Sequence, residues 1–474
     1  MSFTSYTYLA FLLVAVVLVR LTSGRVREVT LLLLSLVFYA AWDVRFVPVL
    51  LAVGVFTYFA AHAVARRDGD AAVSRRRLAW LAWSIAGVLG VLAVFKYSTM
   101  LVELVNLLPF ARLPVPNLVL PLGISFFTFE CVSYLLDVYK GGKELVPLRR
   151  FLLFPAFWPH MVAGPILRIK EFAPQLEAAT PARAAEILAG IDRLLIGWLK
   201  KLVLANALAP LVDQGFSNGA VANSAIDDWV LALAFGLQIY FDFSSYTDIA
   251  IGSARMLGFK FPENFNLPYH ADSPTEFWNR WHMTLSRWIR DYVFFPLNLR
   301  AGRRVWLRYV YLVLVMALVG LWHGAGLCFV LWGAWHGALM VGHRLLQGPA
   351  RRLPEWTEKP LAVAGRLATL ALVNAGWILF RSPTVGQAGR MLRTMFTLRG
   401  LKPAFSVNDY LVVILALGAY LAVEPLLKRF VDRDPLAVDY TRLRFWLRPL
   451  AYGVALDLVF MFDKSNVAFI YFQF

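Results

Sequence analysis

The sequence predicts an all-α integral membrane protein with about twelve transmembrane helices, together with re-entrant and interfacial helices. Of its 474 residues, 59% are hydrophobic and only 16% are charged, whereas about a quarter of the residues of a soluble protein are charged. Long apolar stretches recur from near Tyr6 to near Phe462, with no large polar stretch between them that could fold alone. Residues 1–474 are therefore expected to form a single polytopic membrane domain.

The expected spans follow from the length that a helix needs to cross a bilayer, which is about 20 apolar residues. They lie near 5–20, 29–42, 46–65, 78–95, 118–139, 187–210, 228–251, 305–321, 327–346, 361–380, 409–427 and 447–463. The stretches near 99–109 and 151–165 are too short or too rich in proline to span, so we expect re-entrant or interfacial pieces there.

The formal net charge of +17 is carried largely by short loops between the apolar segments. Orientation in the membrane and attraction to anionic lipid headgroups explain basic loops of this kind. A nucleic-acid-binding surface would need a soluble face, so we expect membrane lipids and no nucleic acid as partners. Cys131 and Cys328 lie inside apolar segments and the histidines are dispersed, which argues against a metal site.

The longest polar interval within the apolar core, 253–304, contains the pattern of an amphipathic helix. Ser273-Pro274-Thr275-Glu276 matches a capping box with proline at the first helical position. Helical spacing then places one apolar face opposite a polar face, with His282 at the edge of the apolar one. The apolar face holds Phe277, Trp278, Trp281, Leu285, Trp288, Ile289 and Tyr292, and the polar face Asn279, Arg280, Arg287, Arg290 and Asp291. This composition is typical of a helix lying in the membrane interface.

Ionisable residues within spans are costly and are candidates for function. Asp242 and Asp248 have serine, tyrosine and glutamine neighbours, so a buried polar network that fixes helix packing is one interpretation of them. His323 lies between apolar runs in Gly320-Leu321-Trp322-His323-Gly324-Ala325-Gly326, where glycines allow close backbone approach. Apolar surroundings favour the neutral imidazole that a general base needs. A lone histidine is also a common structural residue, so position alone leaves both roles open.

His336 follows His323 by thirteen positions. If one helix ran through both residues, they would lie roughly 20 Å apart and would not share a site.

Several classes of protein lack their sequence signatures here. The chain contains no P-loop and no His-Glu-x-x-His, which argues against a nucleotide-driven pump and a zinc protease. A transporter or flippase that uses its intramembrane carboxylates as a proton relay stays open, although no inverted repeat is apparent between the two halves.

Seven segments, in order along the chain, resemble the membrane-bound O-acyltransferase family and its bacterial branch of alginate O-acetylases. They are 32–46 (LLLSLVFYAAWDVRF), 121–141 (PLGISFFTFECVSYLLDVYKG), 157–168 (FWPHMVAGPILR), 238–269, 277–296, 321–326 and 469–474 (FIYFQF). His323 matches the histidine that this family treats as essential. His282 matches the second motif histidine, in Arg-Trp-His-x-x-Leu-Ser-Arg-Trp. The resemblance implies a catalytic core over 118–346.

The resemblance also implies transfer of an acyl group, usually acetyl, from a cytoplasmic thioester such as acetyl-CoA to hydroxyls of an exported polysaccharide. The expected location is the bacterial inner membrane, the expected acceptor is alginate, and no bound cofactor is expected. Peptidoglycan, cellulose, or relay of the acetyl group to a periplasmic acetyltransferase partner are alternatives. His323 and His282 are the expected catalytic residues. Trp322, Trp278 and Asp242 are candidates for substrate or donor binding, and so are Arg280, Arg287 and Arg290 for the donor's phosphates, with a solvated or lipid-facing role as the alternative for each arginine.

Overall fold

The computed structural model describes residues 1–65, 71–108, 112–141, 145–178, 180–217, 224–350, 354–398, 400–431 and 448–462. Throughout these ranges the regular structure is helical and no strand occurs. The all-α prediction is therefore confirmed for the described residues.

Six helical stretches among the described residues are long and apolar enough to cross a membrane: Gly24–Val64, Arg75–Asn106, Ala184–Ser217, Val305–His323, Glu355–Arg381 and Val407–Arg429. Each coincides with one or two of the expected spans. The other expected spans also fall on helices, but three of those are short, with 16 residues in Tyr6–Leu21, 16 in Ile124–Tyr139 and 15 in Arg448–Phe462. A multi-pass membrane protein follows, while the larger count of about twelve crossings stays a prediction.

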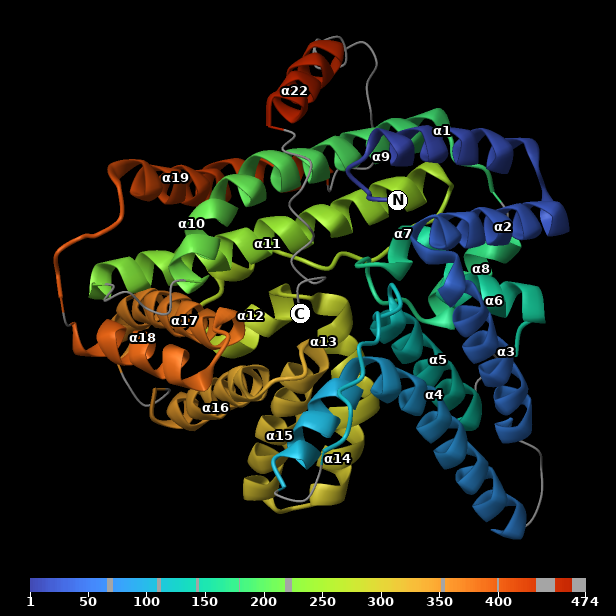
Figure 1. Cartoon of the computed structure of the whole chain (residues 1–474), viewed down its shortest axis with the longest axis horizontal. Helices are drawn as coiled ribbons and strands as arrows, with labels where there is room; N and C mark the ends of the chain where they lie inside the picture. Colours follow the sequence, from blue (N-terminus) through green and yellow to red (C-terminus); the bar gives the residue numbers. More distant parts are fainter. Residues whose placement is uncertain are drawn as a thin grey trace. The chain divides into compact units, whose positions relative to one another are not determined.

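The chain divides into two compact units, the first formed by residues 1–194 and 247–262. Its helices are α1 (Tyr6–Leu21), α2 (Gly24–Asp43), α3 (Val47–Val64), α4 (Ala71–Asn106), α5 (Ile124–Tyr139), α6 (Leu148–Ala156), α7 (Trp158–Met161), α8 (Ile169–Ala178) and most of α9 (Ala184–Trp198), with the 3₁₀ turn η1 (Val44–Phe46) joining α2 to α3. α3, α4 and α5 pack against one another (Figure 1).

The length of α4 corrects one expectation. The stretch near 99–109, expected to be a separate re-entrant piece, is the end of α4 as far as Asn106, so that prediction is wrong. No glycine or proline occurs between Gly90 and Pro109 to interrupt the helix. The stretch near 151–165 is short and interrupted, as expected, with α6 ending at Ala156 and α7 covering only Trp158–Met161.

The second unit contains residues 195–246 and 263–474. It begins with the π-helix η2 (Leu199–Ala205) and α10 (Asn206–Ser217), and it includes α11 (Ala225–Met256) up to Tyr246. The remaining helices are η3 (Pro268–His270), α12 (Pro274–Arg280), α13 (Met283–Ile289), η4 (Arg290–Phe294), α14 (Phe295–Ala301), α15 (Val305–His323), α16 (Leu327–Ala350), η5 (Glu355–Thr357), α17 (Glu358–Arg381), α18 (Val385–Thr397), α19 (Val407–Gly418), η6 (Ala419–Val423), α20 (Glu424–Val431) and α22 (Arg448–Phe462). The expected core 118–346 has residues in both units and stays a prediction.

The expected amphipathic helix is divided in two. The Ser273 side chain accepts a hydrogen bond from the Glu276 backbone N–H and Pro274 occupies the first turn, so the predicted start is confirmed. The prediction of one continuous helix is wrong, because α12 ends at Arg280 and α13 begins only at Met283. Between them, His282 has the left-handed backbone conformation (φ 42°). The Trp-rich face is buried against protein, with Trp281 5.1 Å from Trp377 and Phe277 5.9 Å from His336 between ring centroids. These aromatic rings therefore contact α16 and α17 and not lipid headgroups.

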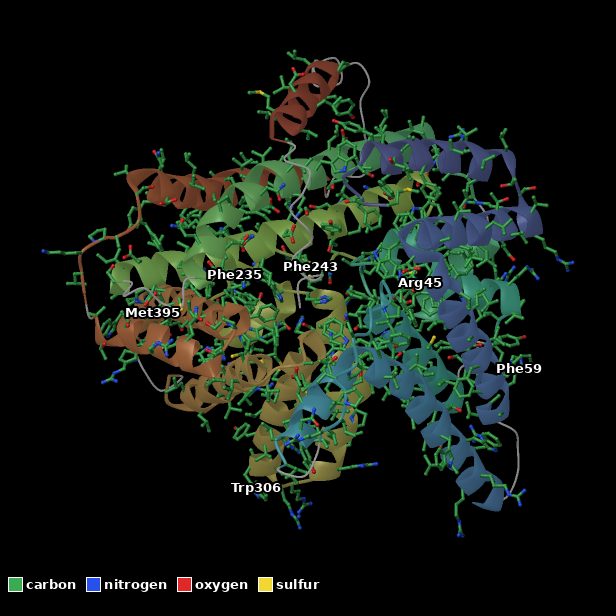
Figure 2. The ribbon with its side chains drawn as sticks, viewed as in Figure 1. Arg45, Phe59, Phe235, Phe243, Trp306 and Met395 are labelled. Carbon is green, nitrogen blue, oxygen red and sulfur yellow. The ribbon has the colours of Figure 1, made fainter. Side chains whose placement is uncertain are left out.

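Large apolar side chains are exposed along the spanning helices. Phe59 on α3 and Trp306 on α15 are 62% and 63% exposed and project away from the ribbon (Figure 2). Apolar exposure of this extent is unusual on a soluble protein and suits helices whose outer faces contact lipid tails.

Candidate active site

A helical hairpin places His323. α15 ends at His323, the chain turns through Gly324 to Gly326, and α16 returns alongside α15 (Figure 1). Glycines permit this packing as expected, because a methyl group on Gly320 would collide with the carbonyl oxygen of Phe329, and one on Gly333 with that of Met316. The close approach of the two backbones fixes the end of α15, and with it the position of the imidazole.

Aromatic rings surround His323, which is 5% exposed. Its ring centroid lies 4.8 Å from that of Trp322, 5.2 Å from Trp332 and 5.4 Å from Phe380, each in an edge-on arrangement. The imidazole is therefore held in a pocket of low polarity, where developing charge in a reaction is poorly screened and neighbouring dipoles act strongly.

His336 belongs to the same cluster. Its ring lies 5.0 Å from Trp332, which also contacts His323, so the separation of roughly 20 Å along one helix does not apply. The physical reason is the break at Gly324 to Gly326, which folds α16 back along α15. Trp278 Nε1 donates a hydrogen bond of 3.4 Å to His336 Nδ1. Because an indole N–H only donates, His336 carries its hydrogen on Nε2.

His282 is a second histidine next to Trp322. It is fully buried, with its ring 4.7 Å from Phe243 on α11, which is labelled in Figure 2, and 6.3 Å from Trp322. Trp322 therefore contacts both histidines that the family motifs single out. Burial lowers the pKa of His282 to about 3, so this imidazole is neutral at physiological pH.

A cavity of about 360 Å³ lies beside this cluster, between α12, α13, η4, α14, α15 and α16. Trp278 lines it at one point, and the Trp278 ring is 5.8 Å from Trp332. Apolar walls come from Leu312, Val315, Met316, Val319 and Met340, and the basic lining residues are Arg287, Arg290 and Arg344.

Of the three arginines expected to bind donor phosphates, Arg287 and Arg290 line this cavity and Arg280 does not. Arg280 Nε donates to Glu276 Oε1 at 2.6 Å, and this hydrogen bond lowers the pKa of Glu276. Arg344 on α16 takes a place in the cavity that the sequence did not suggest.

Asp242 forms a buried ion pair and lies in the second unit. Its Oδ1 is 2.5 Å from Lys201 Nζ, and both side chains are 3% exposed. The preceding lysine, Lys200, pairs with Glu424 at 2.5 Å, so the π-helix η2 directs two consecutive lysines to partners on different helices. Asp248, in the first unit, pairs with Arg193 at 2.8 Å. These contacts are those of a polar network that fixes helix packing, and they give no direct support to substrate binding by Asp242.

Sequence reasoning missed Trp332, Phe380 and Asn264. Trp332 precedes His336 by four positions and so shares its helix face, a spacing that could have indicated contact. Phe380 comes from α17, distant in sequence from His323, and no local pattern points to it. Asn264 accepts hydrogen bonds from His282 and Thr284 across a loop, which only the tertiary structure brings together.

An all-helical membrane protein that buries a histidine among aromatic rings, next to a cavity with a basic lining, is suited to group transfer at a membrane. Residues 91–371 match the membrane-bound O-acyltransferase family, and the chain belongs to this family. It is therefore an O-acyltransferase, in agreement with the resemblance that the motifs gave.

Relatives cover most of the chain. A probable alginate O-acetylase AlgI of Azotobacter vinelandii is 39% identical over 84% of this chain and 78% of its own length. One from Pseudomonas putida is 35% identical over 100% of both chains. The peptidoglycan O-acetyltransferase of Helicobacter pylori is 32% identical over 94% of this chain and 91% of its own length.

Proposed function

We propose that the protein transfers an acetyl group from a cytoplasmic thioester, acetyl-CoA, to hydroxyl groups of an exported polysaccharide, with alginate as the first acceptor to test. The observation that carries this proposal is the position of His323 at the end of α15, buried among Trp322, Trp332 and Phe380. Relatives named for acetylation of alginate and of peptidoglycan support the acetyl group and the glycan acceptor.

His323 acts as the general base. The acceptor hydroxyl oxygen attacks the thioester carbonyl carbon while the imidazole takes the hydroxyl proton. The carbon–sulfur bond then breaks and the acyl group becomes an oxygen ester. The leaving thiolate takes up the proton from the His323 imidazolium, which regenerates the base. Because indole N–H groups only donate, a tryptophan of the cluster such as Trp322 is suited to stabilise the oxyanion. The Trp278 N–H is already used by His336, so Trp278 serves this proposal as a wall of the cavity.

The cavity beside Trp278 is the proposed compartment for the donor. Its apolar walls suit the uncharged arm of a thioester, and Arg287, Arg290 and Arg344 suit the phosphates at the far end of that arm. His323 does not line this cavity, and Trp332 contacts both His323 and the cavity residue Trp278. The reacting end of the thioester must therefore pass these two rings to reach the base.

The remaining parts of the proposal concern place and partners. We place the protein in the bacterial inner membrane with about twelve crossings, and its partners are membrane lipids, the thioester donor and the acceptor glycan. A relay to a periplasmic acetyltransferase is a second route for the same acetyl group. A relative named teichoic acid D-alanyltransferase, from Bacillus subtilis and 32% identical over 50% of this chain, makes an acyl group other than acetyl a further candidate.

The test compares the O-acetyl content of exported polysaccharides from cells that lack the gene, complemented with wild type or with His323→Ala. Wild type restores the O-acetyl groups and His323→Ala does not, although the variant inserts in the membrane at the same level. His62→Gln on α3, a histidine of the first unit, is the matched control and restores them. Full restoration by His323→Ala would refute the role of this histidine, and unchanged acetylation on deletion would refute the proposed acceptor.

A further inference from the structure

Three hydrogen-bond donors converge on the side-chain oxygen of Asn264. The Thr284 backbone N–H donates to Asn264 Oδ1 at 3.1 Å and the Thr284 hydroxyl at 2.8 Å, while His282 Nδ1 lies 3.3 Å from the same oxygen. A backbone N–H can only donate, so the atom that faces these groups is the amide oxygen and not the amide nitrogen. The Asn264 backbone oxygen also accepts from Met283 N at 2.9 Å, which ties Asn264 to the start of α13.

This orientation of Asn264 decides the tautomer of His282. Because Oδ1 is an acceptor, His282 Nδ1 must donate to it and therefore carries the hydrogen. In a neutral imidazole the other nitrogen, Nε2, then holds a lone pair and can only accept.

The Nε2 atom of His282 is buried and has no hydrogen-bond partner among the residues that the structure describes. An acceptor left unsatisfied in the interior is costly, and such groups call for an explanation in each protein. The backbone of His282 is in addition held in the left-handed conformation, which is uncommon for a residue other than glycine. Both features indicate that the ring is placed for a purpose other than stability.

We propose that Asn264 is a positioning residue that holds His282 as the Nδ1–H tautomer, so that His282 Nε2 accepts a hydrogen bond from a neutral donor group of a bound substrate. This inference rests on the proposed function and names a second substrate contact beside His323, with which His282 shares Trp322 as a neighbour. A lone pair repels an anion, so phosphate is unsuited to this position. The suitable groups are the hydroxyl of the acceptor glycan and an amide N–H in the arm of the thioester donor.

Two substitutions of His282 separate its nitrogens. His282→Asn keeps a donor near the position of Nδ1 and tolerates the left-handed backbone, but it has no group at the position of Nε2. His282→Gln can place its amide oxygen near the position of Nε2 and so can keep an acceptor there. In full-length purified protein, we expect His282→Asn to lose at least tenfold in kcat/KM for acyl transfer and His282→Gln to retain more activity than His282→Asn.

The kinetic constants identify the substrate group. A rise in KM for the glycan alone assigns the contact to the acceptor hydroxyl, and a rise in KM for acetyl-CoA alone assigns it to the donor amide. If His282→Asn transfers acetyl at the wild-type rate while the wild type is active, the inference is overturned and the proposed function stands. If wild type and the His62→Gln control are both inactive, the proposed function itself fails.

Asn264→Asp tests the positioning role. A carboxylate still accepts from Nδ1–H, but its charge favours protonation of Nε2, so the acidic limb of the pH profile of kcat/KM moves to higher pH. The rings packed against His282 are those of Phe243 and Trp322, which do not titrate, and the titratable His323 is a further neighbour of Trp322. If Asn264→Asp lowers the stability of the protein but leaves the pH profile of kcat/KM unchanged, the role of Asn264 is only structural and the proposal is overturned.

A spectroscopic measurement covers the case in which a His282 variant does not fold. Nitrogen-15 NMR of the full-length wild-type protein labelled on histidine distinguishes the two tautomers. The signals of His282 are assigned as those absent from the spectrum of whichever variant folds, His282→Asn or His282→Gln. If neither folds, Asn264→Asp assigns it by the shift that its carboxylate causes. We expect a protonated Nδ1 at neutral pH. A protonated Nε2 would overturn the proposal.

Discussion

His160 in the first unit and His282 in the second are both fully buried beside phenylalanine rings, but they differ in how their nitrogens are used. His160 Nε2 donates to the Phe154 carbonyl oxygen at 3.0 Å, and its Nδ1 lies 3.1 Å from Glu130 Oε1. His282 uses only Nδ1 and leaves Nε2 without a partner among the described residues. The comparison teaches that burial alone does not distinguish a structural histidine from a functional one. The role proposed for His282 depends on the nitrogen that has no partner among the described residues.

A large loss of stability is expected when the carboxylate next to His160 is removed. Glu130→Ala leaves a cavity and removes the partner of His160 Nδ1, which is expected to destabilise the fold by about 3 kcal/mol. Glu130→Gln keeps a hydrogen-bonding group in the same place and should cost about 1 kcal/mol or less. Thermal unfolding of the solubilised protein measures both. If the alanine variant is as stable as wild type, the pair is not a structural element.

The ion pair of Asp242 gives a second example of a buried group with a structural partner, within the same unit as His282. Asp242→Ala removes the carboxylate that pairs with the buried Lys201 and is expected to cost roughly 3 kcal/mol, while Asp242→Leu with Lys201→Met removes both charges and should recover most of the loss. Thermal unfolding of the single and double variants makes the comparison. A double variant no more stable than the single one, with a raised KM for acetyl-CoA, would instead support a donor-binding role for Asp242.

Acidity should destabilise the protein through His282. Its folded pKa of about 3 lies below the ordinary value of 6.5, so the unfolded chain takes up a proton that the folded chain refuses. The contribution of His282 to stability is thus complete above about pH 6.5 and falls as the pH drops towards 3, with a loss of about 2 kcal/mol at pH 5. His282→Asn should show a smaller decrease in melting temperature between pH 7.5 and pH 5. An identical decrease in both proteins would contradict a neutral buried imidazole.

The smallest effect is expected at the rim of the donor cavity. Arg290→Gln should raise KM for acetyl-CoA about fivefold, equivalent to about 1 kcal/mol, and should not change KM for a short acetyl thioester without phosphates. Arg280→Gln is the control, because both arginines pair with a neighbouring carboxylate, Arg280 with Glu276 and Arg290 with Asp291, but only Arg290 lines the cavity. Equal effects of the two substitutions would show that the phosphates of the donor do not bind in this cavity.

Local patterns predicted much of the fold, and tertiary contacts decided the rest. Apolar length identified the spanning helices, and the N-cap residue Ser273 located the start of α12, because both depend on residues adjacent in sequence. The periodicity of 277–292 gave the buried face but not the break at His282. Asn264 stabilises that break through hydrogen bonds from the other side of a loop. Because Asn264 lies outside the segment 277–292, the helical periodicity of that segment could not point to it.

The candidate site shows the same division. Motifs selected His323 and His282, and the glycines around His323 indicated close packing of α15 and α16. The neighbourhood of His336 was misjudged because the helix break at Gly324 to Gly326 reverses the chain and brings both histidines to Trp332. The expected motif at 469–474 lies outside the described residues, so its part in the site stays a prediction.

The most direct test of His323 as the general base is a single-turnover measurement with purified protein in lipid nanodiscs. Acetyl-CoA and the polysaccharide are added to wild type, His323→Gln and the control His62→Gln, and ester formation is followed after each variant has been shown to melt as wild type does. We predict a loss of at least about 10²-fold for His323→Gln, the scale of general-base catalysis, and none for His62→Gln. Ester formation by His323→Gln within a factor of two of wild type would contradict the mechanism.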